Sequence, residues 1–171
     1  MILIYIRKTH KMDMRMNHAY GAFLGLACGD AAGAVLEFFR RQITNEIVEK
    51  AIKMPGGGAL KVGSGQLTDD SELAISLANA LSFRNPDDGL PIEQIALNYS
   101  EWFYSNPFDI GSTCAQAFST SKKMDTELLS SRMMKNAVQN SIVSEANGAL
   151  MRVTPIALWC IDQSDSVIAH F

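Results

Sequence analysis

The sequence is poor in the residues that mark disulfide-rich and zinc-binding proteins. It has only three cysteines, and Cys28, Cys114 and Cys160 lie far apart, each inside an apolar stretch. A disulfide framework needs an even set of cysteines, and a zinc site needs closely spaced ones. The three cysteines are therefore interpreted as reduced residues that pack inside the protein.

Basic residues are also scarce. The chain of 171 residues has 15 Lys and Arg against 18 Asp and Glu, a formal net charge of -3. A protein that binds nucleic acid needs a basic face to neutralise phosphates, so nucleic acid is not an expected partner. The length and the 47% of hydrophobic residues are ordinary for one soluble globular domain.

No long hydrophobic run opens the chain. The apolar residues 2–6 are followed, not preceded, by positive charge, and a membrane-spanning helix needs about 20 apolar residues. We therefore expect neither a signal peptide nor a membrane partner, and we expect a cytoplasmic location. Residues 1–16 are treated as an N-terminal extension without an assigned function.

β-Structure has little support in the sequence. Apart from residues 2–6, no stretch alternates apolar and polar side chains, and apolar residues instead recur at helical spacing. The expected helices cover a first segment ending near residue 31 and then residues 73–81, 92–103, 113–120, 126–140 and 150–161. Pro91 is expected in the first turn of its helix, and Asn106-Pro107 should end it. We predict an all-α domain over residues 17–171.

Two groups of glycines interrupt this pattern. The first group, on one side of the first helix, is Gly21, Gly25, Gly29 and Gly33. It predicts a smooth face on which a neighbouring helix packs closely, and a helix end that directs Glu37 inward. The second group, between residues 55 and 65, predicts a loop leading into Thr68. It lacks the Gly-Lys-Ser/Thr ending of a phosphate-binding loop.

Oxygen donors gather where this loop meets the next helix. Thr68, Asp69 and Asp70 place one hydroxyl and two carboxylates on consecutive residues. Neighbouring carboxylates repel one another unless a cation lies among them, and oxygen ligands favour Mg²⁺, Mn²⁺ or Ca²⁺ over zinc. The pattern predicts a metal site. An ordinary helix start fits the same residues, with Asp69 as the N-cap, Glu72 completing a capping box and Asp70 complementing the helix dipole.

Three other segments accompany this one. The stretch from Gly21 to Phe38 contains Gly29-Asp30 and Glu37, and downstream lie Gly111-Ser112-Thr113 and Asn147-Gly148-Ala149-Leu150-Met151-Arg152. In this order and at these separations, the four segments resemble the ADP-ribosylglycohydrolase family. The resemblance runs from about Asn17 to Phe171. It implies an all-helical domain that hydrolyses the glycosidic bond linking ADP-ribose to a modified side chain or small molecule.

The resemblance also implies a binuclear magnesium centre. The residues that carry over as metal ligands are Glu37, Thr68, Asp69 and Asp70. Catalytic roles carry over to Glu37, as the acid/base, and to Asp69. The two ions would orient ribose hydroxyls and activate a bound water while the carboxylate transfers a proton. For Glu37 the alternative is a solvated charge near a helix end, because two arginines follow it.

The later segments are expected to bind ADP-ribose. The residues that carry over to ligand contacts are Gly111, Ser112, Thr113, Asn147, Gly148, Met151, Arg152 and His170. Backbone N–H groups at residues 111–113 would meet a phosphate, although an ordinary Ser or Thr N-cap fits there too. For Arg152 both a phosphate contact and a structural ion pair are open. His170 falls where many family members have a Thr-His pair, with Ala169 in place of the Thr.

The family pattern is incomplete in this chain. The Asp-x-Asp-Thr run that completes both metal sites in the family occurs nowhere in the 171 residues. We expect the chain to be a truncated, N-terminal part of the family domain, with an incomplete magnesium centre, weak metal binding, and either self-association or a complementing C-terminal segment. Three functions stay open: a hydrolase acting on ADP-ribosylated protein, an ADP-ribose-binding pseudoenzyme, and a structural protein like the jellyfish lens crystallins of this fold.

Overall fold

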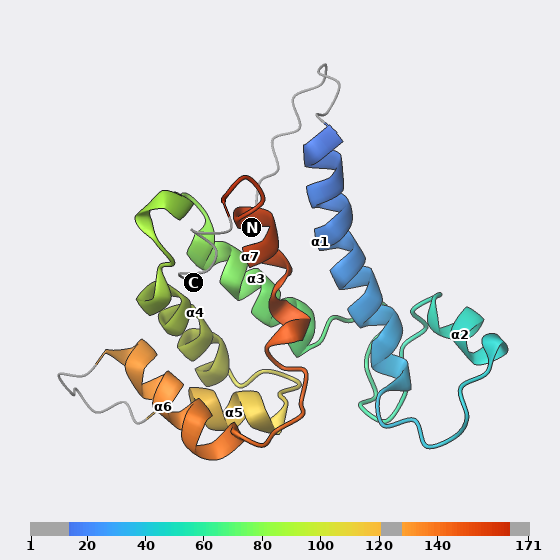
Figure 1. Cartoon of the computed structure of the whole chain (residues 1–171). Coiled ribbons are helices and arrows are strands. Elements are labelled where there is room, and N and C mark those ends of the chain that lie inside the picture. Colours follow the sequence, from blue (N-terminus) through green and yellow to red (C-terminus); the bar gives the residue numbers. More distant parts are fainter. Residues whose placement is uncertain (1–13, 121–127, 165–171) are drawn as a thin grey trace.

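The described part of the chain is built from helices. The computed structural model describes residues 14–120 and 128–164, and within these residues it contains seven α-helices, three short 3₁₀ helices and one isolated β-bridge (Figure 1). The α-helices are α1 (Met14–Gly33), α2 (Asn45–Ala51), α3 (Asp69–Leu81), α4 (Ile92–Tyr104), α5 (Ser112–Phe118), α6 (Leu129–Ser141) and α7 (Thr154–Trp159). The 3₁₀ segments are η1 (Ala34–Leu36), η2 (Pro86–Asp88) and η3 (Leu150–Arg152). The predicted all-α fold is confirmed.

The apolar periodicity placed most helices within a few residues of their observed bounds. The short helix α2 was not predicted, because its seven residues hold too little apolar pattern. Pro91 is the N-cap of α4 and not a first-turn residue. The helix ends as expected before Pro107, where Asn106 adopts a left-handed φ of 61°.

The central element of the bundle is α3. Its buried apolar residues are Leu73, Ala74, Leu77, Ala80 and Leu81. Spacings of three and four residues place them on one stripe of the helix, which packs against α4, α7 and α1. Burying a leucine side chain stabilises a fold by about 1.5–3 kcal/mol, so this stripe fixes α3 firmly in the bundle.

Aromatic rings join α4 to α5. The rings of Tyr99 and Phe118 stack with centroids 5.1 Å apart, and Trp102 meets Phe118 edge-on at 6.3 Å. The carboxylate of Glu93 on α4 accepts hydrogen bonds from the first two backbone N–H groups of α6, at 2.9 and 3.0 Å. A carboxylate at a helix N-terminus is stabilising, so Glu93 anchors α6 to α4.

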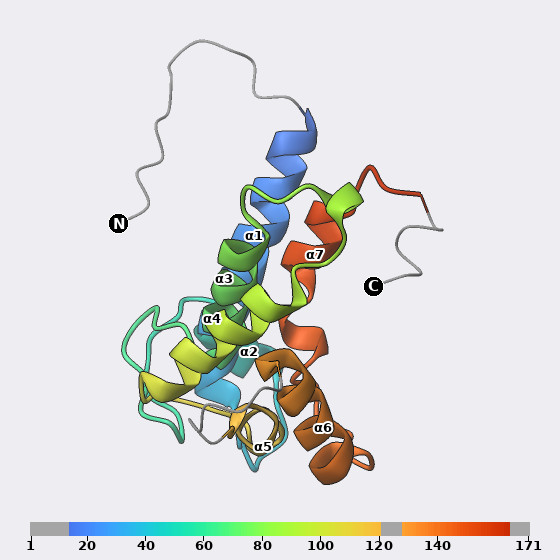
Figure 2. The ribbon, with the colours of Figure 1, turned by 90° about the vertical axis from the view of Figure 1, so that its left-hand side faces the viewer.

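Helix α1 lies at one side of the bundle (Figure 1) and behind α3 in the view of Figure 2. Most of its residues are exposed. Ala31 is its one buried residue, whereas Leu24 is 62% exposed. Together with η1 it forms the one segment in the described residues that is long and apolar enough to cross a membrane, judged by length and composition alone, and 11% of that apolar stretch is buried. Within this segment, Asp30 is hydrogen-bonded to Thr68 at the start of α3.

The glycine face of α1 has no close neighbour among residues 14–120 and 128–164. A Cβ atom added at Gly21, Gly25, Gly29 or Gly33 would meet nothing within 4 Å. The prediction that a helix packs closely on these glycines is therefore not met by the part of the chain that the structure describes.

The cysteines are unpaired, as predicted. Cys114 and Cys160 are buried, whereas Cys28 is exposed on α1. The expectation that all three pack inside the protein was therefore wrong for Cys28, because the apolar helix around it is mostly uncovered.

The glycine-rich loop between α2 and α3 holds the segment that precedes Glu37. At Gly58, with φ of 71°, an added Cβ would lie 2.8 to 3.1 Å from backbone atoms of Val35 in η1. At Gly56, with φ of 78°, it would lie 2.7 Å from the carbonyl oxygen of Val62. Only glycine combines this backbone conformation with such close approach. The loop thus fixes η1 before it reaches Thr68.

Candidate functional site

The start of α3 is held by a residue of α1. Asp30 accepts hydrogen bonds from the backbone N–H of Thr68 at 2.9 Å, from the Thr68 hydroxyl at 2.6 Å and from the backbone N–H of Ser71 at 3.2 Å. Thr68 is the N-cap of α3 and is buried, and its own side chain makes no capping bond. The cap is therefore supplied by Asp30, 38 residues earlier in the chain.

Asp69 connects α3 to α5. Its Oδ2 atom accepts a hydrogen bond of 3.0 Å from the backbone N–H of Gly111, the N-cap of α5. The capping box considered above is absent, because Glu72 accepts a hydrogen bond from Trp102 Nε1 at 2.7 Å instead. The helix-start alternative was thus wrong in its details: Asp69 is not the N-cap.

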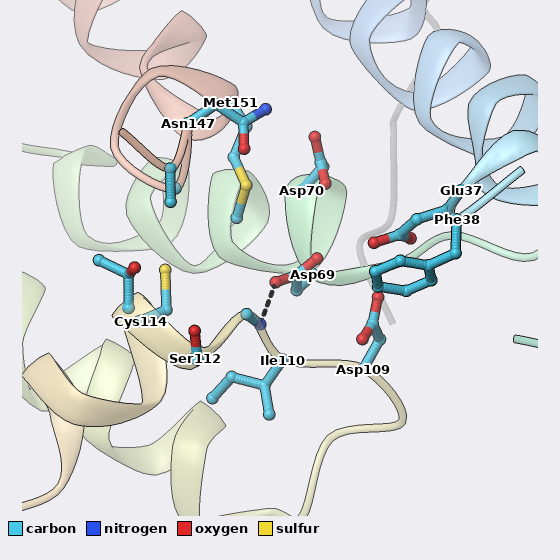
Figure 3. A pocket seen from close by; sticks show the side chains of 14 residues that line it. Glu37, Phe38, Asp69, Asp70, Asp109, Ile110, Ser112, Cys114, Asn147 and Met151 are labelled. Atoms are coloured by element: carbon cyan, nitrogen blue, oxygen red, sulfur yellow. Dashed lines mark hydrogen bonds between the residues drawn. The ribbon is translucent and has the colours of Figure 1, made fainter. Parts of the chain in front are cut away.

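Glu37 approaches these residues from the opposite side. It follows η1 in an extended conformation and precedes Phe38, whose φ of 56° is uncommon for a bulky residue. Figure 3 shows Glu37 and Asp109, from two separate loops, with the Phe38 ring between them and with Asp69 of α3 nearby, whereas the Asp70 side chain lies above Asp69 in this view. Although Glu37 is largely exposed, its carboxylate belongs to this group.

Two hollows meet at the carboxylates. The first has a volume of about 410 Å³, and the predicted site residues that line it are Glu37, Asp69, Asp70, Gly111, Ser112, Thr113, Asn147, Gly148 and Met151. The second, of about 430 Å³, shares Glu37, Asp70 and Asn147 with the first and adds Asp30 and Thr68. Hollows of this size are typical of small-molecule sites. Residues predicted from four separate segments are thus brought together.

The electrostatics of the site are those of crowded acids. Burial, reinforced by the charges of Asp30 and Asp69, raises the pKa of Asp70 to about 6. Burial and the neighbouring carboxylates, Asp109 foremost, also raise the pKa of Glu37. Burial and then the charge of Asp69 raise the pKa of Asp109. Each pKa moves upward because adding negative charge to this space is unfavourable.

The donor set suits a hard divalent cation. Carboxylate and hydroxyl oxygens are the ligands that Mg²⁺ prefers, and the described residues lining the first hollow include no Lys, Arg or His that would neutralise them. Within residues 14–120 and 128–164, however, no three Asp, Glu, His or Cys side chains come close enough to cage an ion. The donor atoms of the described residues fit Mg²⁺ by chemical type, but they are not gathered closely enough to surround an ion.

Two predicted ligand residues also serve the packing behind the site. A Cβ atom on Gly148 would lie 2.8 Å from Cys114 Sγ, so this glycine also makes room for a buried thiol. The guanidinium of Arg152 lies 4.8 Å from the centre of the Tyr99 ring and 5.3 Å from that of Phe118, and it donates to Cys114 Sγ at 3.1 Å. Arg152 therefore packs against aromatic rings and lines neither hollow. This favours a structural role over a phosphate contact, although its partners are rings and not the acidic side chain of an ion pair.

Two acidic residues of the site were missed from the sequence. Neither Asp30 nor Asp109 was assigned a role from the sequence, although Asp30 lies in the Gly21 to Phe38 segment that carries the resemblance. The lone carboxylate on a largely apolar helix was the available signal for Asp30. His170, a predicted ligand residue, lies outside the described residues.

The sequence as a whole matches a known family. A family model described as ADP-ribosylglycohydrolase matches residues 11–170. The chain belongs to the ADP-ribosylglycohydrolase family. The all-helical fold and the convergence of the four segments agree with this membership.

Several curated relatives carry hydrolase names. The chain is 34% identical over 145 residues to the ADP-ribosyl-[dinitrogen reductase] glycohydrolase of Rhodospirillum rubrum, an alignment covering 83% of this chain and 44% of that protein. It is 30% identical over 141 residues to an ADP-ribosylarginine hydrolase of Serratia proteamaculans, covering 80% of this chain and 37% of the relative. A hydrolase of the same name from Pseudomonas putida is 40% identical over 67 residues, covering 39% and 17%. The chain thus spans less than half the length of these relatives.

Proposed function

We propose that this chain supplies the first part of an enzyme that hydrolyses the glycosidic bond between ADP-ribose and a modified side chain. The observation that carries the proposal is that Glu37, Asp69, Asp70 and Asp109, from three separate segments, line one hollow. The same hollow is lined by residues 111–113 and 146–148, the segments expected to contact ADP-ribose. The names of the relatives, which describe hydrolases of ADP-ribosylated dinitrogen reductase or arginine, support the same reaction class.

Mg²⁺, held by Glu37, Thr68, Asp69 and Asp70, would polarise ribose hydroxyls and lower the pKa of water. The chain's own residues do the rest. Glu37 has a raised pKa and a largely exposed carboxylate, which suits it to exchange a proton with a ligand. The Asp69 carboxylate is held in one orientation by the Gly111 N–H.

The charge of the site predicts that metal and ligand bind together. ADP-ribose carries a diphosphate, and an acidic hollow lined by no basic side chain repels it. A divalent cation reverses this balance. We therefore infer that the chain binds ADP-ribose only when Mg²⁺ is present, and that the polar rim at Ser112 and Asn147 then orients the ligand.

Calorimetric titration of ADP-ribose into the 171-residue chain, with and without Mg²⁺, tests the proposal. Binding should be detected only with Mg²⁺, and Asp69→Asn should weaken it at least about tenfold while the circular dichroism spectrum is kept. Glu37→Gln should also weaken metal-dependent binding without altering the fold. Gln116→Ala, an exposed position outside the hollow, is the matched control and should bind as the unmodified chain does.

The same preparation distinguishes the alternatives. Release of ADP-ribose from an ADP-ribosylarginine peptide would establish hydrolysis by this chain. Metal-dependent binding without release would favour a binding module or dependence on further chain. No heat with either ligand would contradict the proposal and favour a crystallin-like structural role.

We further propose that α1 is the docking face for a complementing C-terminal segment of the kind that the longer relatives contain. The exposed Tyr20 and Leu24, together with the open glycine face, leave apolar surface of the type that protein interfaces cover. Co-expression with the C-terminal part of the Rhodospirillum rubrum relative, as a separate polypeptide, tests this. Co-purification that is lost in Leu24→Asp supports the proposal, whereas no co-purification contradicts it.

A further inference from the structure

Asp30 is the one carboxylate on α1, and all three of its recorded hydrogen bonds go to residues at the start of α3. The two carboxylate oxygens have different partners. Oδ2 accepts the backbone N–H groups of Thr68 and Ser71, at 2.9 and 3.2 Å. Oδ1 accepts the hydroxyl of Thr68 at 2.6 Å. The first oxygen therefore caps a helix, and the second acts on a side chain.

The bond to the hydroxyl has a direction. A carboxylate can only accept, so the Thr68 hydroxyl must donate its hydrogen to Asp30. A separation of 2.6 Å is within the range of charge-assisted O–H···O⁻ bonds, which are about twice as strong as neutral ones. With its hydrogen committed to Asp30, Thr68 Oγ1 has lone pairs left for a second partner. Thr68 is 4% exposed, and it lines the second hollow together with Asp30 and Asp70.

We infer that Asp30 is a positioning residue for metal binding, and this inference rests on the proposed function. It holds the Thr68 hydroxyl so that Oγ1 offers lone pairs, not a hydrogen, to a divalent cation beside Asp70. Groups that orient metal ligands from behind commonly change metal affinity 10- to 100-fold when they are removed. Asp30 lies on α1 and Thr68 precedes α3, so the affinity of the site for a metal ion depends on the position of α1 relative to α3.

Asp30→Asn separates the two actions of the residue. The amide oxygen of the asparagine can replace Oδ2 and accept both backbone N–H groups, which keeps the cap of α3. The amide nitrogen then replaces Oδ1 and donates to Thr68 Oγ1, which occupies a lone pair and turns the hydroxyl hydrogen away. The cap of α3 is kept, and Thr68 Oγ1 is no longer available as a metal ligand.

The experiment is a titration of Mn²⁺, a spectroscopic substitute for Mg²⁺, into the 171-residue chain, followed by the electron paramagnetic resonance signal of free Mn²⁺. Asp30→Asn should weaken Mn²⁺ binding at least about tenfold. Glu93→Gln is the matched control, because Glu93 also caps a helix with two backbone N–H bonds but lies outside both hollows. It should bind Mn²⁺ as the unmodified chain does. Because Glu93 uses a separate oxygen for each N–H group and glutamine keeps only one of them, Glu93→Gln should lower the urea unfolding midpoint more than Asp30→Asn does.

Asp30→Glu provides a second test should the asparagine variant fail to fold. It keeps two acceptor oxygens and should retain more Mn²⁺ affinity than Asp30→Ala, which keeps none. Mn²⁺ binding by Asp30→Asn within twofold of the unmodified chain, or equal binding by the Glu and Ala variants, would overturn the inference.

Asp69→Asn separates this failure from failure of the proposed function. If the unmodified chain binds Mn²⁺ and Asp69→Asn does not, the metal site is real and the Asp30 variants decide the inference alone. If the unmodified chain and Asp69→Asn behave identically, the metal site itself is refuted, and the inference falls with it.

Discussion

The carboxylate of Asp69 and the backbone N–H of Gly111 are joined by a hydrogen bond of 3.0 Å across 42 residues of sequence. This contact ties the first turn of α3 to the first turn of α5, so the acidic group and the expected ligand-binding turn keep one relative position. A preorganised carboxylate loses less conformational freedom when it binds a cation than a mobile one does.

Replacing Gly111 tests this contact directly. Gly111 has φ of −63°, which proline can adopt, so Gly111→Pro should remove the N–H while keeping the backbone path. We expect Mn²⁺ affinity to fall roughly tenfold, measured by paramagnetic resonance. Gly111→Ala is the matched control, because its Cβ would lie at an ordinary 3.8 Å from Asp69 Oδ2 and its N–H is retained. Equal losses in both variants would refute the importance of the hydrogen bond.

The raised pKa of Asp70 predicts a pH-dependent stability. In the metal-free chain its pKa is about 6, against an ordinary value of 3.8, so between these values the folded state binds more protons than the unfolded state. The group therefore costs stability progressively as pH rises from about 4 to about 6. Asp70→Asn should be equal in stability to the unmodified chain near pH 4 and more stable near pH 7, by on the order of 1 kcal/mol once solvent screening is allowed for.

Urea unfolding at several pH values, with and without Mg²⁺, measures this effect. Mg²⁺ should stabilise the unmodified chain more at pH 7 than at pH 4, and Asp70→Asn should lose much of that gain. If Asp70→Asn is less stable than the unmodified chain at pH 7 without metal, the inference that the charge of Asp70 is unfavourable among its acidic neighbours is wrong.

The contact of Gly148 with Cys114 predicts that the effects of substitutions at these two positions on stability depend on each other. Gly148→Ala would bring a methyl group within 2.8 Å of Cys114 Sγ, and overpacking of this kind costs about 1–3 kcal/mol. Cys114→Ala removes the sulfur, so the double variant should lose less stability than the sum of the single variants. A double-mutant cycle by urea unfolding gives the coupling energy. Additive losses would show that the two residues do not interfere.

Arg152 should behave as a core residue. Arg152→Lys would keep the charge but lose the planar stacking on Tyr99 and Phe118, and we expect a loss of about 1 kcal/mol in the free energy of unfolding. Affinity for ADP-ribose in the presence of Mg²⁺, measured calorimetrically on folded protein, should stay within twofold. A loss of affinity without a loss of stability would instead indicate a phosphate contact.

Local patterns were sufficient for most of the fold. Helical spacing of apolar residues located α3 and α4, because a stripe such as Leu73, Leu77 and Leu81 is recognisable within a single segment. The same reasoning over-interpreted the glycines of α1. Small residues at every fourth position show that another helix could pack closely on this face, but they do not show that such a helix is present.

The site was predictable only in part, because some of its residues interact with partners that are distant in the sequence. Consecutive oxygen donors at residues 68–70 are visible in the sequence, and family resemblance connected them with Glu37 and the later segments. Asp30 and Asp109 act through partners that folding brings from distant segments, so neither carries a local signature. The orientation of Arg152 depends on two rings from other helices, which no spacing within its own segment encodes.

The close approach of Gly58 to Val35 has a consequence for how sequences of this kind can diverge. The backbone of this loop packs against the turn that precedes Glu37 and so fixes its conformation, although the two segments are more than twenty residues apart in the sequence. Bulkier replacements at position 58 would displace the general acid/base candidate without touching it. Mutational tolerance in this region should therefore follow steric fit to a backbone neighbour, and not distance from the reacting bond.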